Sequence, residues 1–257
     1  MEWVRQNDFG VRVEWGLAGA QEVGPGSSCV VVVDVLSFST SVTVLVERGT
    51  HVLPYPWREG AADFAAAQGA QVAVGRRAVT ARQPWSLSPA ALRRAPFADR
   101  LVLPSPNGST ISAAVSEIPV VVASLRNASA VANWIRGRGW GTAANPVTVI
   151  AAGEHWPNRD LLRPAVEDWL GAGAVVAALG DTGPLSPEAE AARASYLAAT
   201  DLAATVTESA SGRELRTGGF PDDVAIAVEL ESSSAVPLLV DGAFTDAGRV
   251  TGTAAGR

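Results

Sequence analysis

Short runs of apolar, largely β-branched residues recur along the chain, and segments with helical spacing separate them. Such runs are typical of strands buried on both faces of a parallel sheet. They predict strands over residues 11–15, 30–33, 51–55, 71–75, 101–105, 119–124, 147–153 and 236–241. The helices that we expect cover 40–49, 59–68, 109–116, 128–137, 164–179, 187–211 and 221–231. This alternation predicts an α/β protein with three α/β/α layers and a mostly parallel or mixed sheet.

The length of 257 residues is enough for a single large α/β domain, or for two subdomains. GRGWGTAANP, residues 137–146, is the expected boundary if there are two, and the tail at 250–257 is expected to fray. No apolar run reaches the roughly 18 residues of a membrane span. MEWVRQNDFG lacks the layout of a signal peptide. We therefore expect a soluble cytoplasmic protein.

All twenty basic residues are arginines, so the chain has no lysine for a Schiff base, a pyridoxal phosphate anchor or a P-loop. The net charge is −6 and the arginines are dispersed, which does not favour a nucleic-acid partner. An anionic ligand must therefore be bound by arginine, backbone amides and metal. Cys29 is the sole cysteine, so the chain cannot form an internal disulfide, and we expect a buried thiol in its strand.

The strand at 30–33 ends at Asp34, and three hydroxyl residues, Ser37, Ser39 and Thr40, come before the next helix. Ligands of open α/β sheets lie beyond the carboxyl ends of the strands. A carboxylate followed by hydroxyls at a helix start suits Mg²⁺ beside a phosphate. Ordinary capping of the turn and of the helix explains the same residues. This segment by itself does not decide between the two.

Three further strand ends carry polar residues of the same kind. They are Asn107, Gly108, Ser109 and Thr110 after 101–105, Arg126 and Asn127 after 119–124, and Glu154 after 147–153. Amides and hydroxyls at a helix start can bind an oxyanion, although a turn with an N-cap looks the same in sequence. His155 is a candidate proton-transfer group beside Glu154. Four such strand ends on one sheet edge predict a binding site.

Glu167 and Asp168 fall in the first turns of the helix that we expect to begin at Pro164. Acids there stabilise a helix, and they could also complete a Mg²⁺ site. Gly171 and Gly173 in the same helix indicate close packing against the core. Two histidines make a zinc site improbable, and no GxSxG elbow is present. Leu36 stands where a haloacid dehalogenase would have a second aspartate.

The order of the motifs resembles the 2-phosphosulfolactate phosphatase (ComB-type) family from about residue 9 to 244. The motifs are DVLSFSTS (34–41), VGRR (74–77), SLSP (86–89), PNGST (106–110), LRNA (125–128), AAGE (151–154), EDWLGAG (167–173), SGREL (211–215) and DDVAIAVEL (222–230), followed by Val236-Pro237. The resemblance implies a compact ComB-like α/β/α fold. It also implies a Mg²⁺-dependent phosphatase that converts 2-phospho-3-sulfolactate to 3-sulfolactate and phosphate, a step toward coenzyme M.

The chain departs from the family pattern at three places. Many members have glutamate where Arg76 stands, an arginine where Ser37 stands, and two threonines where Ser105 and Pro106 stand. The positions of arginines determine which sulfonate or carboxylate is recognised. The alternatives are therefore a phosphatase of another small phosphorylated hydroxy acid and a non-catalytic relative that binds anions.

These considerations give each candidate residue an expected role. We expect Asp34, Glu167 and Asp168 to bind Mg²⁺, and Asp34, Glu154 and Asp168 to be catalytic, with a carboxylate that either orients water or attacks directly. The predicted partner is a small anionic phosphorylated substrate, with no nucleic acid or membrane, and a homodimer is left open. The expected substrate-binding residues are Ser37, Ser39, Thr40, Arg76, Arg77, Asn107, Gly108, Ser109, Thr110, Arg126, Asn127 and Arg163.

Overall fold

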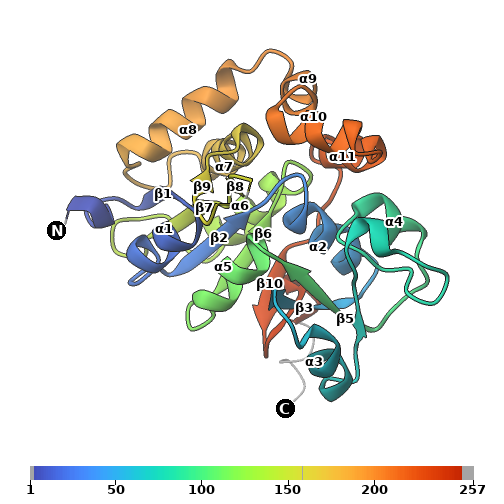
Figure 1. The fold of residues 1–257 in the computed structure, drawn as a ribbon. Coiled ribbons are helices and arrows are strands. Elements are labelled where there is room, and N and C mark those ends of the chain that lie inside the picture. Colours follow the sequence, from blue (N-terminus) through green and yellow to red (C-terminus); the bar gives the residue numbers. More distant parts are fainter. Residues whose placement is uncertain (1–2, 158, 251–257) are drawn as a thin grey trace.

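The structure is a computed structural model that describes residues 3–157 and 159–250 (Figure 1). Its centre is a nine-stranded sheet in the order β1-β7-β2-β6-β10-β11-β3-β5-β4. The strands at each end of the sheet pair in parallel. Between these two groups lies the hairpin of β10 and β11, in which β10 pairs antiparallel with β6 and β11 pairs antiparallel with β3. The strands are β1 Val11–Trp15, β2 Cys29–Val33, β3 His51–Pro56, β4 Gln71–Val72, β5 Arg100–Ser105, β6 Val120–Ala123, β7 Val147–Ala151, β10 Pro237–Val240 and β11 Ala243–Asp246.

Helices cover both faces of this sheet. Alternate residues of β2 point to opposite faces, so Val31 packs with α6, α7 and α8 while Val32 packs with α1, α2 and α5. The three-layer α/β/α fold and the mixed sheet predicted from the sequence are confirmed. The helices are α1 Gly16–Val23, α2 Phe38–Glu47, α3 Ala61–Ala67, α4 Pro89–Arg94, α5 Gly108–Ala114, α6 Ala128–Arg136, α7 Val166–Leu179, α8 Pro187–Ala198, α9 Leu202–Thr207, α10 Ala210–Thr217, α11 Pro221–Ala227 and α12 Ala247–Val250.

The expected long helix at 187–211 is wrong, because this segment forms α8 and α9 and the start of α10. The side chain of Asp201 accepts a hydrogen bond from the backbone of Ala204, and Ser209 accepts one from Gly212. Each residue is an N-cap, which starts a new helix and ends the continuity of the previous one. The three short helices therefore turn back over the sheet edge, where α10 and α11 reach the site described below (Figure 1).

Several elements are absent from the sequence prediction. The helix α1 and the strand β11 were missed, as was a small separate hairpin of β8 (Glu154–His155) and β9 (Leu162–Arg163). The Asp241-Gly242 turn between β10 and β11 has positive φ at both residues, as two-residue hairpin turns require. An Asp-Gly pair between apolar residues is a known hairpin signal, so β11 was detectable.

The remaining expectations concern single residues and segments. Cys29 is fully buried, as expected. In the described ranges, none of the helices is long and apolar enough to cross a membrane. The segment 137–146 connects α6 to β7, and its role as a subdomain boundary stays a prediction. The frayed tail predicted at 250–257 lies, from residue 251 onward, outside the described residues.

Candidate active site

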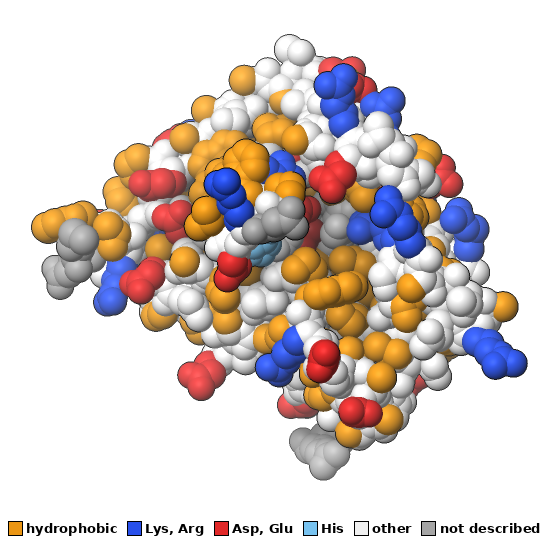
Figure 2. All heavy atoms as spheres, in the orientation of Figure 1, with side chains coloured by type: hydrophobic (Ala, Val, Ile, Leu, Met, Phe, Trp, Pro, Cys, Tyr) orange, Lys and Arg blue, Asp and Glu red, His pale blue; other side chains and the backbone are white. Residues whose placement is uncertain are grey.

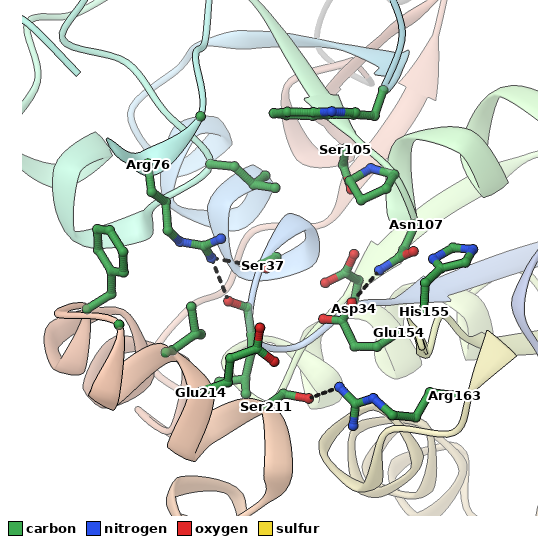
Figure 3. A pocket seen from close by; sticks show the side chains of 18 of the residues that line it. Asp34, Ser37, Arg76, Ser105, Asn107, Glu154, His155, Arg163, Ser211 and Glu214 are labelled. Carbon is green, nitrogen blue, oxygen red and sulfur yellow. Dashed lines mark hydrogen bonds between the residues drawn. The ribbon is translucent and has the colours of Figure 1, made fainter. Parts of the chain in front are cut away.

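A pocket of about 1050 Å³ opens where β2, β5 and β7 end (Figure 3). Three of the four predicted strand ends contribute to its lining, through Asp34, Asn107 and Glu154. The opposite wall comes from the short 3-10 helix η2 (Arg76–Ala78), from α10 and from Phe220, which precedes α11. Residues from distant parts of the chain therefore meet at the carboxyl edge of the sheet, which is where α/β folds bind ligands.

Backbone amides fix the orientation of Asp34 in the pocket. Its Oδ1 accepts a hydrogen bond from Phe38 N at 3.1 Å, and its Oδ2 accepts one from Gly108 N at 3.2 Å. A Cβ on Gly108 would stand 2.2 Å from the ring of Phe38, so only glycine lets the turn after β5 approach the turn after β2 this closely. Two hydrogen bonds thus orient the Asp34 carboxylate in the turn between β2 and α2.

Glu154 lies beside Asp34 and has a positioning partner. Asn107 Nδ2 donates a hydrogen bond to Glu154 Oε2 at 3.0 Å. Figure 3 shows the side chains of Asn107, Glu154 and Asp34 grouped together, with Arg163 on one side and Arg76 on the other. Two carboxylates and one amide therefore converge on the same part of the pocket.

Asp168 supports this arrangement from below, because it is buried and does not line the pocket. Its Oδ1 accepts a hydrogen bond from Val35 N at 2.7 Å, and its Oδ2 accepts one from Gly153 N at 2.8 Å. It thereby ties the end of β2 to the end of β7. Glu167 is also buried outside the lining. Both acids lie in the first turn of α7, as predicted.

The close packing predicted for the α7 glycines is confirmed. A Cβ on Gly171 would come within 2.7 Å of the side chains of Val33 and Val35, and one on Gly173 would come within 2.1 Å of Ala192 O. The first contact brings α7, with its acids, directly under the end of β2. The second holds α8 against the outer side of α7.

Burial and like-charged neighbours raise the pKa values of Asp34, Glu154 and Asp168. Burial raises the pKa of Asp34 to about 6, and the neighbouring Glu167 adds to this, whereas the two amides and Arg76 oppose it. Burial and the charge of Asp34 raise the pKa of Glu154 to about 7. Burial, Asp34 and Glu167 also raise the pKa of Asp168 well above its usual range. Buried carboxylates with like-charged neighbours favour binding of a proton or a cation.

Arg76 forms the opposite wall and joins three separate sequence motifs. Its Nε contacts Asp223 Oδ2 at 2.9 Å, and its Nη2 donates to Ser37 Oγ at 3.0 Å. Asp223 also accepts hydrogen bonds from Ser88 Oγ at 2.5 Å and from Ala90 N at 3.1 Å. The motifs at 74–77, 86–89 and 222–230 therefore meet at this one aspartate.

Two further arginines reach the pocket. Arg163 Nη2 donates to Ser211 Oγ at 3.2 Å, which links β9 to α10 across the opening. Arg77 is exposed and lines the pocket near the end of α10. Of the residues predicted to bind substrate, Ser37, Arg76, Arg77, Asn107 and Arg163 thus border the pocket.

The other predicted hydroxyls are engaged by the backbone and do not line the pocket. Ser39 Oγ accepts from Asp34 N and donates to Val32 O, while Thr40 Oγ1 donates to Val35 O. Ser109 Oγ donates to Leu103 O, and Thr110 Oγ1 donates to Ser105 O. These four hydroxyls stabilise the two strand-to-helix turns. Such a role corresponds to the alternative considered for them in the sequence, namely capping instead of phosphate binding. Gly108 acts through its amide on Asp34.

Arg126 and Asn127 are also outside the lining of the pocket. Arg126 is 2% exposed and pairs with Glu47 at 3.2 Å and with Glu229. Asn127 Nδ2 donates to Val122 O and Ala235 O, and its Oδ1 accepts from Ser124 N. The end of β6 therefore carries a charge-paired structural cluster, although its sequence resembles that of the other strand ends.

Sequence reasoning missed part of the lining. Ser211 and Glu214 lie in the SGREL segment, which entered the prediction as a motif without a role. Neither Trp57 nor Phe220 gave any signal in the sequence, since only the fold brings them to the pocket. Ser105 Oγ is buried with no hydrogen-bond partner among the described residues. His155 lines the pocket, and its Nε2 lies 3.7 Å from Oδ1 of Asp160.

The side chains at the pocket could hold Mg²⁺ through two carboxylates, if waters and the substrate phosphate supply the other ligands. Across the part of the chain that the structure describes, no group of three or more histidine, cysteine or acidic side chains is arranged to hold a metal ion. Mg²⁺ commonly takes one or two carboxylates and completes its shell with waters and substrate phosphate. Asp34 and Glu154 provide two such carboxylates, and both have raised pKa values that a cation would relieve.

Comparison with known proteins agrees with this geometry. The 2-phosphosulpholactate phosphatase family model matches residues 20–242. A curated relative, the 2-phosphosulfolactate phosphatase of Methanothermobacter thermautotrophicus, is 30% identical over 220 residues, which cover 84% of this chain and 89% of the relative. The matched region contains Asp34, Asn107, Glu154 and the arginine-lined wall. The chain therefore belongs to the 2-phosphosulpholactate phosphatase family, a family of phosphoric monoester hydrolases.

Proposed function

We propose that this protein is a Mg²⁺-dependent phosphatase that hydrolyses 2-phospho-3-sulfolactate, or a related phosphorylated 2-hydroxy acid, to the free hydroxy acid and phosphate. The observation that carries the proposal is the meeting of Asp34 and Glu154, both with raised pKa values, in a pocket whose walls contain arginines. Membership of the family supports the same reaction type. The 2-phosphosulfolactate substrate, the metal and a cytoplasmic role toward coenzyme M are parts of this proposal.

Each acid has a role that its surroundings favour. Two amides orient Asp34, so its carboxylate is ready either to attack phosphorus or to position a water molecule. Glu154 has a pKa of about 7 without a cation, so near neutral pH it can release its proton as Mg²⁺ binds. Mg²⁺ held by these carboxylates would neutralise charge on the phosphoryl oxygens.

The arginines account for recognition of the rest of the substrate. Arg76, Arg77 and Arg163 border the pocket, and their guanidinium groups can donate hydrogen bonds to a carboxylate or sulfonate. Arg76 is already oriented by Asp223, which reduces the entropy lost when it binds an anion. A substrate with a second anionic group is therefore favoured over a simple alkyl phosphate.

The direct test is phosphate release from 2-phospho-3-sulfolactate, 2-phospholactate and 2-phosphoglycerate, each assayed with Mg²⁺ and with a chelator. We expect release that requires Mg²⁺ and is fastest for a substrate with a second anionic group. No release from any of the compounds contradicts the proposal. Absence of release together with tight binding of the same compounds would favour the alternative of a non-catalytic anion binder.

A further inference from the structure

Three aromatic side chains from separate elements line the pocket, and they have no role in the reaction described above. Trp57 follows β3 and is 55% exposed, Trp156 follows β8 and is 50% exposed, and Phe220 precedes α11. We call these three side chains the aromatic rim. Exposed aromatic rings beside a pocket are typical of sites that contact a ligand.

The aromatic rim is close to the arginines that we expect to bind the substrate's anionic group. Trp57 Cη2 lies over Gly75, 3.8 Å from the position that a Cβ there would occupy. The guanidinium of the adjacent Arg76 lies 5.9 Å from the centre of the Phe220 ring. Trp156, two residues after Glu154, also lines the pocket. All three rings therefore line the same pocket as Asp34 and Glu154.

Apolar side chains continue the same wall. Leu36, Leu87 and Leu215 line the pocket in addition to the aromatic rim. Figure 2 shows hydrophobic side chains gathered in the middle of this face, with charged side chains beside them. A ligand that uses this surface needs an apolar part as well as its anionic groups.

The size of the pocket leads to the same conclusion. Its volume is about 1050 Å³, just above the roughly 300–1,000 Å³ that is typical of pockets for drug-sized ligands. The apolar part of 2-phospho-3-sulfolactate is a single methylene group between charged groups. Such a substrate would occupy the region of Asp34 and Glu154 and leave the aromatic rim in water.

We propose that this pocket accepts a phosphorylated 2-hydroxy acid in which C2 carries, besides the phosphate and the carboxylate, a group with an aromatic ring. Trp57 and Trp156 bind this ring. The inference rests on the proposed phosphatase function. The oxygen of water bonds to phosphorus, and the bond between phosphorus and the oxygen on C2 breaks. That oxygen takes a proton, so the products are a 2-hydroxy acid with an aromatic ring and phosphate. The phosphate lies at Asp34 and Glu154, and the carboxylate lies at the arginines.

The O-phosphates of lactate and 3-phenyllactate test this directly, because they share the phosphate and carboxylate and differ by one phenyl ring. We expect kcat/KM to be roughly tenfold to a hundredfold higher for the phenyl compound, since burial of such a ring contributes about that much to affinity. Trp57→Ala should lower this ratio at least about fivefold through KM. Trp3→Ala is the matched control, because Trp3 is 79% exposed and does not line the pocket.

Other outcomes separate the alternatives. Equal kcat/KM for the two compounds in the unmodified protein overturns the inference and leaves the proposed function intact. An equal loss of kcat for both compounds in Trp156→Ala also overturns the inference. The indole of Trp156 would then act on every substrate and would not recognise the phenyl ring. If neither compound releases phosphate, the proposed function fails, and calorimetry decides the inference: tighter binding of the phenyl compound, lost in Trp57→Ala, supports it, and equal binding overturns it.

Discussion

The ends of β2 and β6 are adjacent in the sheet and carry similar sequence signals, yet they hold charge in opposite ways. At the end of β2, Asp34 receives hydrogen bonds from two amides, and within the described residues it forms no salt bridge. At the end of β6, Arg126 is paired with two glutamates. One strand end retains an unneutralised charge, whereas the other is neutralised inside the protein.

The pKa directions make this difference concrete. The pKa of Asp34 is raised to about 6, mainly by burial. The pKa of Glu229 is lowered by hydrogen bonds from Arg93 and Arg126, despite partial burial. Perturbed acids without a counter-charge are common at functional sites, whereas removal of one partner of a buried ion pair destabilises the fold. The comparison therefore favours the β2 end as the candidate active site and indicates structural support at the β6 end.

Asp34→Asn tests the functional side of the comparison and should have the largest effect. The amide keeps the shape of the side chain but removes the charge that binds a cation or attacks phosphorus. We expect Mg²⁺-dependent phosphate release to fall by at least about a hundredfold. Circular dichroism and thermal melting are the controls for folding. A folded variant with full activity would remove Asp34 from the active site.

Arg126→Met tests the structural side. It leaves Glu47 and Glu229 without their buried partner, so we expect a loss in unfolding free energy. Because both glutamates are partly exposed, this loss should be limited to about 2 to 3 kcal/mol. The KM of the folded protein should not change. Arg93→Met is the matched control, because Arg93 pairs with the same Glu229 at the surface and should cost under about 1 kcal/mol. A raised KM with unchanged stability would instead make Arg126 a substrate-binding residue.

Glu154→Gln tests the pKa shift through stability in the presence of a chelator. The folded pKa of Glu154, about 7, exceeds its ordinary value of 4.5, so the folded state binds more protons between these pH values. Its contribution to stability is full below pH 4.5, declines as pH rises, and is lost above about 7. Between pH 5 and 8 the unmodified protein should lose roughly 1 to 3 kcal/mol more stability than Glu154→Gln.

Urea unfolding at several pH values measures this difference. Glu117→Gln is the control, because Glu117 is exposed and does not line the pocket. Parallel stability profiles for the unmodified protein and Glu154→Gln would show that Glu154 has an ordinary environment. Mg²⁺ should restore stability above pH 7 if the carboxylate helps to hold it.

Arg76→Gln should have the smallest effect on activity. The buried Asp223 would keep its hydrogen bonds from Ser88 and Ala90 but lose its charged partner, so we also expect a loss of about 2 to 3 kcal/mol in unfolding free energy. Losing one guanidinium contact should raise KM about tenfold for a substrate with a second anionic group. Arg82→Gln, which changes an exposed arginine outside the pocket lining, is the control. An unchanged KM would mean that Arg76 serves only to position Asp223 and Ser37.

Local pattern was sufficient for most of the fold. The β-branched run at β2 and the Asn-Gly turn before α5 are signals that neighbouring residues produce, so the elements formed near their expected places. The helix predicted over 187–211 failed because the caps Asp201 and Ser209 divide an alanine-rich stretch that has strong helical propensity throughout. A capping residue inside such a stretch is a local signal that outweighs average propensity.

For the site, the sequence by itself determined that polar residues would follow buried parallel strands, and it named Asp34, Asn107 and Glu154 among them. Only the tertiary structure decided which charges remain unpaired. Arg126 meets Glu47 and Glu229, which are far from it along the chain, whereas Asp34 meets other acids. A charge is stabilised or perturbed by burial and by its neighbours in space. Those neighbours exist only after the sheet has assembled.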